Sequence, residues 1–143
     1  MKLDINAPII PFEGLGGIKL YSTREELKEI LNMVDTKSQV YDNWIEYHIQ
    51  DKIALTFNLN NNKLLRISTL SAYKGKLFGR IYVGMQEEEI PKVEPSFRYN
   101  DFEEFWETDK GVAIATDIIT HKVVCIAVYV PEWDLEGFEE GNW

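Results

Sequence analysis

A pattern of glycine, apolar and acidic residues occurs twice in this chain and limits the folds that it can adopt. Residues 14–31 read GLGGIKLYSTREELKEIL, and residues 79–93 read GRIYVGMQEEEIPKV. Ile18 in the first copy matches Ile81 in the second, 63 residues later. Self-similarity at a fixed spacing is typical of a structural unit that is used more than once.

The residues that follow each copy are also similar. Residues 52–55 resemble residues 111–114, and residues 62–67 resemble residues 121–126, both at a separation of 59. Each unit is too short to bury a core alone, so we expect both to share one sheet and one core in a single domain, residues 1–143. That domain is predicted to consist of repeat one (about 14–72), repeat two (about 79–130) and an acidic, aromatic tail (131–143).

The charge of the chain is uneven. The formal net charge is −9, with +2 over residues 1–85 and −11 over residues 86–143. Binding to nucleic acid draws most of its affinity from clustered Lys and Arg, so direct contact with nucleic acid is not expected. An acidic surface either keeps a protein in solution or complements a basic partner.

Helices are expected in three places. Ser22 and Thr23 each have a Glu three residues on, Glu25 and Glu26, which is the spacing of a capping box. Apolar residues recur at helical spacing up to Val34, so a helix is predicted over residues 22–34. Pro91 limits the matching helix of the second unit, because proline lacks a backbone N–H. A third helix is predicted after Asn100, with a strand beginning at Phe105 as the alternative.

Strands are predicted where apolar and polar residues alternate or where apolar residues run together. Residues 123–130 form the most apolar run, which favours a central place in the sheet. The predicted fold class is therefore α+β: two tandem strand-helix-antiparallel-strand repeats form one sheet with helices packed on one face. The strands are expected at residues 18–20, 45–49, 53–59, 64–70, 112–116 and 123–130.

No catalytic or metal-binding motif is recognisable. His48 and His121 lie far apart in the sequence, and neither has a second His or a Cys at ligand spacing. Cys125 is the one cysteine, so no intramolecular disulfide can form, and its apolar surroundings predict a small buried side chain. We expect no enzyme activity, no cofactor and no bound metal. A pair of acidic catalytic residues is the alternative, but no spacing singles one out.

The first residues lack the apolar core of a signal peptide, and no run of the chain reaches membrane-spanning length. A cytoplasmic protein without membrane contact is therefore expected.

Aromatic side chains are frequent, and most are expected in the core or covering the sheet. The large apolar groups of the tail either fold back on the body or bind a partner, since Trp and Phe supply much contact area. Together with acidic residues of the second unit they are the predicted partner-binding residues: Glu103, Glu104, Glu107, Trp133, Asp134, Glu136, Phe138, Glu139, Glu140 and Trp143.

The two copies of the repeated motif carry a family resemblance. Residues 17–27, and especially residues 81–90 with Gly84 and Met85, resemble the glycine-methionine helix-start motif of the BamE-like and beta-lactamase-inhibitor-protein-like families. The resemblance implies a helical segment packed on an antiparallel sheet. It also implies that the sheet face binds another protein, as the tandem inhibitor binds an enzyme.

A small acidic protein of this type also resembles the immunity proteins that bacteria pair with polymorphic or contact-dependent growth-inhibition toxins. The resemblance implies a cognate protein toxin as the partner. Nuclease toxins are commonly basic, so an acidic inhibitor gains steered association. We expect an inhibitor that neutralises a basic nuclease domain. The alternative is a non-catalytic binding or scaffold module of a cell-envelope or cytosolic assembly.

Overall fold

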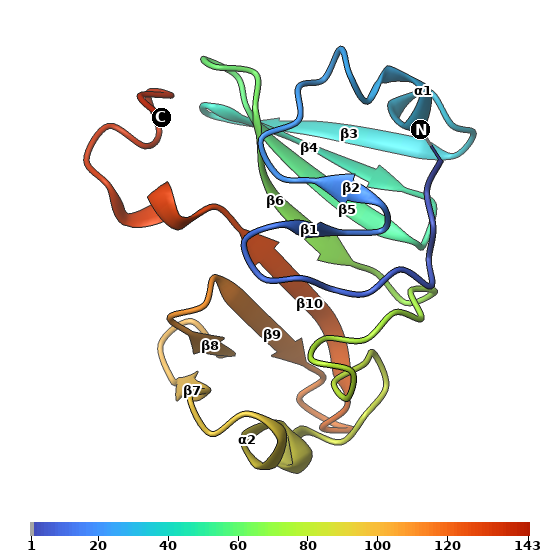
Figure 1. Ribbon diagram of the computed structural model, residues 1–143, viewed down its shortest axis with the longest axis vertical. Helices are drawn as coiled ribbons and strands as arrows, with labels where there is room; N and C mark the ends of the chain where they lie inside the picture. Colours follow the sequence, from blue (N-terminus) through green and yellow to red (C-terminus); the bar gives the residue numbers. More distant parts are fainter. Residues whose placement is uncertain (1) are drawn as a thin grey trace.

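The computed structural model describes residues 2–143 and is built around one eight-stranded antiparallel sheet (Figure 1). The strands lie side by side in the order β3-β4-β5-β6-β10-β9-β8-β7. Their bounds are β3 (Thr36–Tyr41), β4 (Trp44–Ile49), β5 (Ile53–Asn58), β6 (Leu64–Thr69), β7 (Arg98–Asn100), β8 (Phe105–Thr108), β9 (Val112–Thr116) and β10 (Val123–Tyr129).

The order of the strands is mirrored about the centre of the sheet. β3 to β6 form one four-stranded meander, β7 to β10 form another, and the two join through antiparallel pairing of β6 with β10. This junction pairs Ala127 with Ser68, Val128 with Ile67 and Tyr129 with Arg66. The central place predicted for residues 123–130 is therefore confirmed, and both halves of the chain contribute to one continuous sheet.

The predicted α+β class, with helices packed on one face of the sheet, is wrong. The protein is mostly β, with 39% of its residues in strands and 11% in helices, and its longest helical segment has 7 residues. That segment consists of a 3-10 turn, η1 (Glu87–Glu89), continued by α2 (Ile90–Val93). The other helical elements are α1 (Lys28–Leu31) and the 3-10 turn η2 (Pro131–Asp134).

The first predicted helix is reduced to one turn. Thr23 and Glu26 do form the reciprocal capping box, since each backbone N–H donates to the other's side chain. Only α1 follows, because the backbone leaves the helical region at Leu27 before it and at Asn32 after it. Asp35 then adopts a positive φ of 60°, and β3 begins at Thr36. Val34, which the apolar stripe placed on the buried side, is 74% exposed.

The third predicted helix is also wrong, and the alternative strand from Phe105 is confirmed. The Asn100 side chain accepts hydrogen bonds from the backbone N–H groups of Phe102 and Glu103, at 3.0 and 2.9 Å. These contacts hold a tight turn between β7 and β8, a role that Asn performs as readily as helix capping. The prediction that Pro91 keeps its helix short is confirmed by α2.

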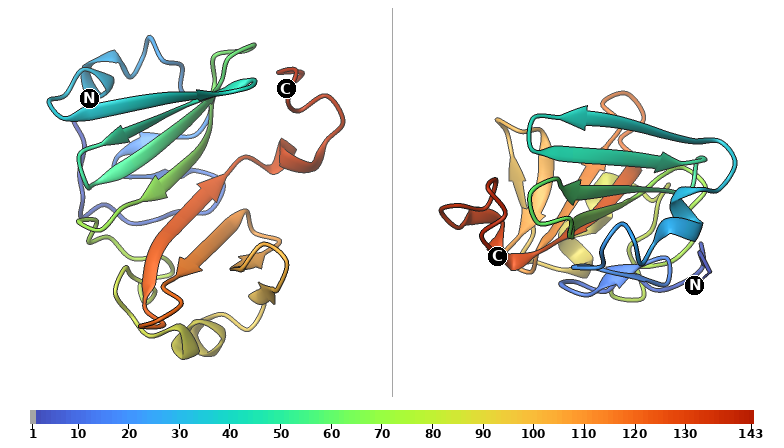
Figure 2. Two further views of the ribbon diagram at one scale, coloured as in Figure 1. Left: turned by 180° about the vertical axis from the view of Figure 1, so that it is seen from behind. Right: turned by 90° about the horizontal axis from the view of Figure 1, so that it is seen from above.

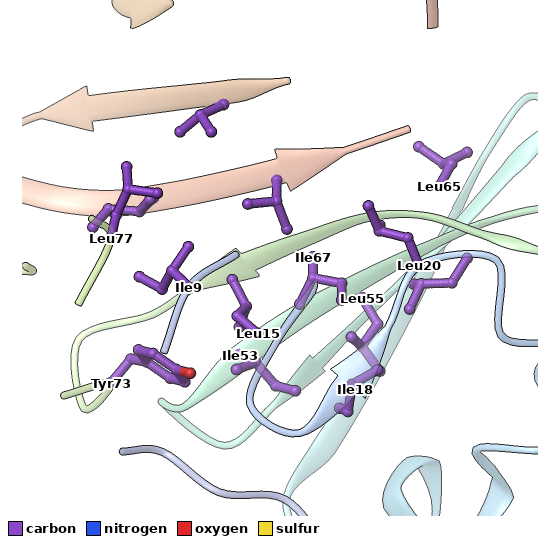
Figure 3. Packing of buried hydrophobic residues seen from close by; sticks show 14 of the residues in the cluster. Ile9, Leu15, Ile18, Leu20, Ile53, Leu55, Leu65, Ile67, Tyr73 and Leu77 are labelled. Carbon is purple, nitrogen blue, oxygen red and sulfur yellow. The ribbon is translucent and has the colours of Figure 1, made fainter. Parts of the chain in front are cut away.

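One face of the sheet carries the hydrophobic core. The N-terminal arm crosses this face and includes a small antiparallel hairpin of β1 (Gly14–Leu15) and β2 (Ile18–Lys19) (Figure 1). Figure 3 shows Leu15, Ile18 and Leu20 of the arm packed against strand residues such as Ile53 and Leu55. Irregular chain therefore covers most of the face on which helices were expected.

β5 differs from its predicted half-buried alternation, because all six of its residues are buried. Its core-facing residues pack under the arm, whereas Ala54 and Thr56 lie on the opposite face and are only 5% and 3% exposed. Longer neighbouring side chains shield these short side chains from solvent, so the burial of Ala54 and Thr56 indicates a hollow in the surface.

Candidate binding groove on the open sheet face

The face of the sheet opposite the core, here called the open face, has no covering arm over β3 to β6 (Figure 2, left). Strand register aligns one row of side chains across it. His48, Ala54, Ser68, Ala127, Ala113 and Glu107 are successive partners from β4 to β8. Adjacent strands lie about 4.8 Å apart, so these five steps extend roughly 24 Å.

Four small residues in the middle of this row, Ala54, Ser68, Ala113 and Ala127, form a floor between two polar ends. Side chains of neighbouring rows rise around this floor and enclose a groove with a volume of about 440 Å³. The groove is lined by Glu46, His48, Ala54, Arg66, Ser68, Leu70, Phe105, Glu107, Ala113, Ala115, Cys125, Ala127, Tyr129, Trp133 and Asp134. Three carboxylates and one guanidinium therefore line it, which makes it acidic.

The end of the groove over β4 and β6 is internally paired. Arg66 Nη2 lies 3.4 Å from Glu46 Oε2 and 3.5 Å from Thr56 Oγ1, and the Arg66 guanidinium stacks over the Trp133 ring at 5.8 Å. His48 Nε2 is 2.5 Å from the other Glu46 oxygen. These contacts already use the Glu46 carboxylate, so this end offers little free charge to a ligand.

The other part of the groove, called the acidic end, contains Phe105, Glu107, Tyr129, Trp133 and Asp134. It meets the paired end where Tyr129 lies opposite Arg66 in the sheet. Burial, and then the negative charges of Glu107 and Asp134, raise the pKa of the Tyr129 phenol. The two carboxylates therefore converge on this phenol from β8 and from the C-terminal segment. The same three residues also line an adjoining hollow of about 550 Å³, so the acidic end is open on two sides.

The C-terminal segment, residues 131–143, folds back on the body, as one of the two alternatives predicted. Trp133 and Phe138 pack against Trp44 of β4, with ring centroids 5.4 and 6.4 Å from it. Asn58, which is fully buried, donates to the backbone carbonyls of Phe138 and Glu139 at 3.3 and 3.0 Å. The segment is thus a fixed wall of the groove.

The structure distributes the predicted partner-binding residues over three places. Glu107, Trp133 and Asp134 line the groove. Phe138, Glu139 and Glu140 line a second hollow, with Phe138 itself buried, while Trp143 is half-buried and Glu136 is exposed. Glu103 and Glu104 are exposed in the turn between β7 and β8, outside the groove.

Sequence reasoning missed the floor of the groove and its paired end. The alternation of Glu46 and His48 with apolar neighbours did indicate a polar face on that strand. The small residues Ala54, Ser68, Ala113 and Ala127 carry no such signal individually. Only the register of four strands, β5, β6, β10 and β9, brings them into one row.

Other reactive groups have ordinary surroundings. Burial raises the pKa of the Cys125 thiol, which therefore stays neutral at physiological pH and is less buried than its sequence context predicts. His121 pairs with Glu87 outside the groove. Among residues 2–143, no group of three or more His, Cys, Asp or Glu side chains is arranged to hold a metal ion.

Comparison with known proteins supports the fold only. No protein-family model and no curated protein matches the sequence. A crystal structure at 1.5 Å resolution of an extracellular protein containing an SCP domain, from Bacillus anthracis strain Ames, is similar to this chain with a TM-score of 0.51. The sequences are 13% identical, and the match covers 79% of this chain and 44% of the other.

Within residues 2–143, no helix combines the length and the apolar character that crossing a bilayer requires.

Proposed function

We propose that this protein is a non-catalytic inhibitor that binds a basic partner protein on the open face of its sheet. The single observation that carries the proposal is the acidic groove on that face, built on a floor of small residues and walled by aromatic side chains. Pre-formed concave surfaces lined by aromatic and a few polar groups are typical binding sites. Rigid strands hold the groove in place without a partner.

The charge of the second half of the chain, −11, supports a basic partner. Opposite charges steer two proteins together and raise their association rate, most strongly at low salt. We propose that the partner is a bacterial toxin domain of the nuclease type, because such domains need basic surfaces to hold phosphate chains. The protein would then act as its cognate immunity protein in the cytoplasm.

A growth assay tests this function. Where a toxin domain is encoded beside the gene, it is expressed from an inducible promoter together with the wild-type protein or with a variant. Wild-type protein and the control Glu13→Gln/Glu88→Gln, which neutralises exposed acids away from the groove, should restore growth. Glu107→Gln/Asp134→Asn should protect poorly. Equal protection by all three proteins would show that the groove is not the contact surface.

Binding of the purified pair gives the physical measurement. We expect a one-to-one complex whose association rate falls as the salt concentration rises, because salt screens the attraction between the acidic groove and the basic partner. At low salt the Glu107→Gln/Asp134→Asn variant should associate on the order of 10-fold more slowly than the control. An association rate that does not change with salt would argue against electrostatic steering.

A second candidate, a binding module of a larger assembly, is favoured by the solved structure, because the shared fold makes up 44% of a longer chain. That protein is extracellular, whereas we propose a cytoplasmic location for this one. Cell fractionation of the native host separates the two candidates. Recovery outside the cell, together with failure to protect against the neighbouring toxin domain, would favour the module.

A further inference from the structure

The two ends of the groove differ in how their carboxylates are paired. At the paired end, Glu46 contacts both Arg66 and His48. At the acidic end, Glu107 accepts one hydrogen bond, at 3.3 Å, from the neutral Asn100 amide. Asp134 has no hydrogen bond or ion pair with any residue in the range 2–143. The acidic end therefore presents two carboxylates that form no ion pair within residues 2–143. Two guanidinium groups border this end: Arg66 lies over Trp133 and opposite Tyr129, and Arg98 is the strand partner of Glu107.

Aromatic rings stand beside these carboxylates. The Tyr129 and Trp133 ring centroids are 5.3 Å apart, and Phe105 lines the same end of the groove. A cation gains from the face of an aromatic ring as well as from a carboxylate, and both interactions strengthen when water is displaced. The chemistry of this end therefore matches a cationic, partly flat group.

The protein itself contains an example of this match. The Arg66 guanidinium lies over the Trp133 ring at 5.8 Å while one of its nitrogens faces the Glu46 carboxylate. Trp133 of the acidic end and Glu46 of the paired end thus hold one guanidinium where the two ends meet. The acidic end has the same two kinds of group, with two carboxylates in place of one.

We propose that the acidic end of the groove binds an arginine side chain of the basic partner, whose guanidinium donates to Glu107 and Asp134 and lies against Tyr129. Arginine fits better than lysine because its planar guanidinium stacks on rings and pairs with more than one acceptor. The inference deepens the proposed inhibitor function, since it names the side chain that anchors the partner.

Titration with a small arginine derivative tests the inference without the partner. Nα-acetyl-arginine N-methylamide is added to isotopically labelled protein, and the methyl signals of Ala113 and Ala127 in the groove floor are followed by NMR. The matched ligand is the citrulline derivative, which has nearly the same shape and no charge. We expect the arginine derivative to shift both methyl signals and to saturate the site. The corresponding lysine derivative should bind at least fivefold more weakly, and the citrulline derivative should not saturate the site.

Protein variants complete the test. Glu107→Gln/Asp134→Asn should bind the arginine derivative at least fivefold more weakly, whereas Glu13→Gln/Glu88→Gln should bind it as the wild type does. Equal binding of citrulline, or shifts confined to residues outside the groove, would overturn the inference. If arginine binds the groove but the protein gives no protection in the growth assay, the toxin proposal fails and the arginine site stands.

Discussion

Buried polar side chains fix the irregular parts of this fold at single points. Tyr73 lies under the N-terminal arm, where its hydroxyl donates to the Ala7 carbonyl at 2.6 Å and accepts from the Gly16 N–H at 2.7 Å. One phenol therefore satisfies two backbone groups that are 9 residues apart in the arm. This arm has few backbone partners of its own on the sheet, so such contacts determine how it lies.

We expect Tyr73→Phe to lower the free energy of unfolding by about 1–3 kcal/mol, because the buried Gly16 N–H and the part-buried Ala7 carbonyl lose their partner together. Urea denaturation measures the change. Tyr41→Phe is the matched control, since Tyr41 is 49% exposed, and it should change stability by less than about 0.5 kcal/mol. Equal losses in the two variants would contradict this role of Tyr73.

Asn58 has the corresponding role for the C-terminal segment. Its side-chain oxygen accepts from the N–H groups of Asn60 and Asn61, at 2.7 and 3.1 Å, while its amide nitrogen donates to the segment. Asn58→Ala should cost about 2–3 kcal/mol and release residues 136–142 to faster hydrogen exchange. Asn32→Ala, at an exposed position, should leave that exchange unchanged. Unaltered protection in Asn58→Ala would place the anchor of the segment elsewhere.

Secondary structure was predictable to the extent that local pattern decides it. The alternation of apolar and polar residues correctly predicted β4, and a continuous apolar run correctly predicted β10. Both strands pair with their neighbours over most of their length. Helices were overpredicted, because capping and apolar spacing around Thr23 also suit a tight turn, and nucleating a helix is unfavourable for a short segment. The backbone leaves the helical region at Asn32, before strand β3 begins at Thr36.

The element formed by η1 and α2 is fastened to the sheet by Glu87. Its carboxylate accepts hydrogen bonds from Trp106 Nε1 at 2.9 Å and Thr116 Oγ1 at 3.3 Å, and it lies 3.1 Å from His121 Nδ1. Burial raises the pKa of Glu87, but these hydrogen bonds together outweigh burial and lower it below the ordinary value of 4.5. The charged form is thus the stabilising one.

This lowered pKa fixes the sign of a pH dependence. A carboxylate whose pKa is lower in the folded state stabilises above its unfolded pKa, and this contribution is lost as pH falls through the folded pKa. We expect the wild type to lose stability below pH 4.5 more steeply than Glu87→Gln. Urea denaturation at a series of pH values from 7 to about 3 measures both proteins. Glu88→Gln, an exposed neighbour, should keep the wild-type slope; parallel slopes for wild type and Glu87→Gln would contradict the assignment.

At the scale of the whole molecule, the sequence indicated the acidic charge of the second half but not the position of the groove. The excess of acid in the second half is visible in composition, and three of its predicted residues, Glu107, Trp133 and Asp134, do line the groove. The groove also needs Glu46 and Arg66 from the other half. Their approach depends on β6 pairing with β10, which no local pattern specifies.

That junction also predicts how the protein unfolds. One cluster of buried side chains runs through both halves, from Ile45 and Phe57 to Ile114 and Ile90. Val128 of β10 is fully buried in it and lies opposite Ile67 of β6 on one side and Val112 of β9 on the other. A small domain with one shared core is expected to unfold in a single cooperative step.

Val128→Ala removes two buried methyl groups at the junction and should lower the free energy of unfolding by about 2 kcal/mol. Because the core is shared, native-state hydrogen exchange should accelerate by the same factor in β4 and β8, which lie in opposite halves of the sheet. Val124→Ala on the same strand is the matched control, since Val124 is 44% exposed, and it should change neither strand measurably. Faster exchange in β8 alone would mean that the halves are separate cooperative units, and the groove between them would then open without unfolding of the protein.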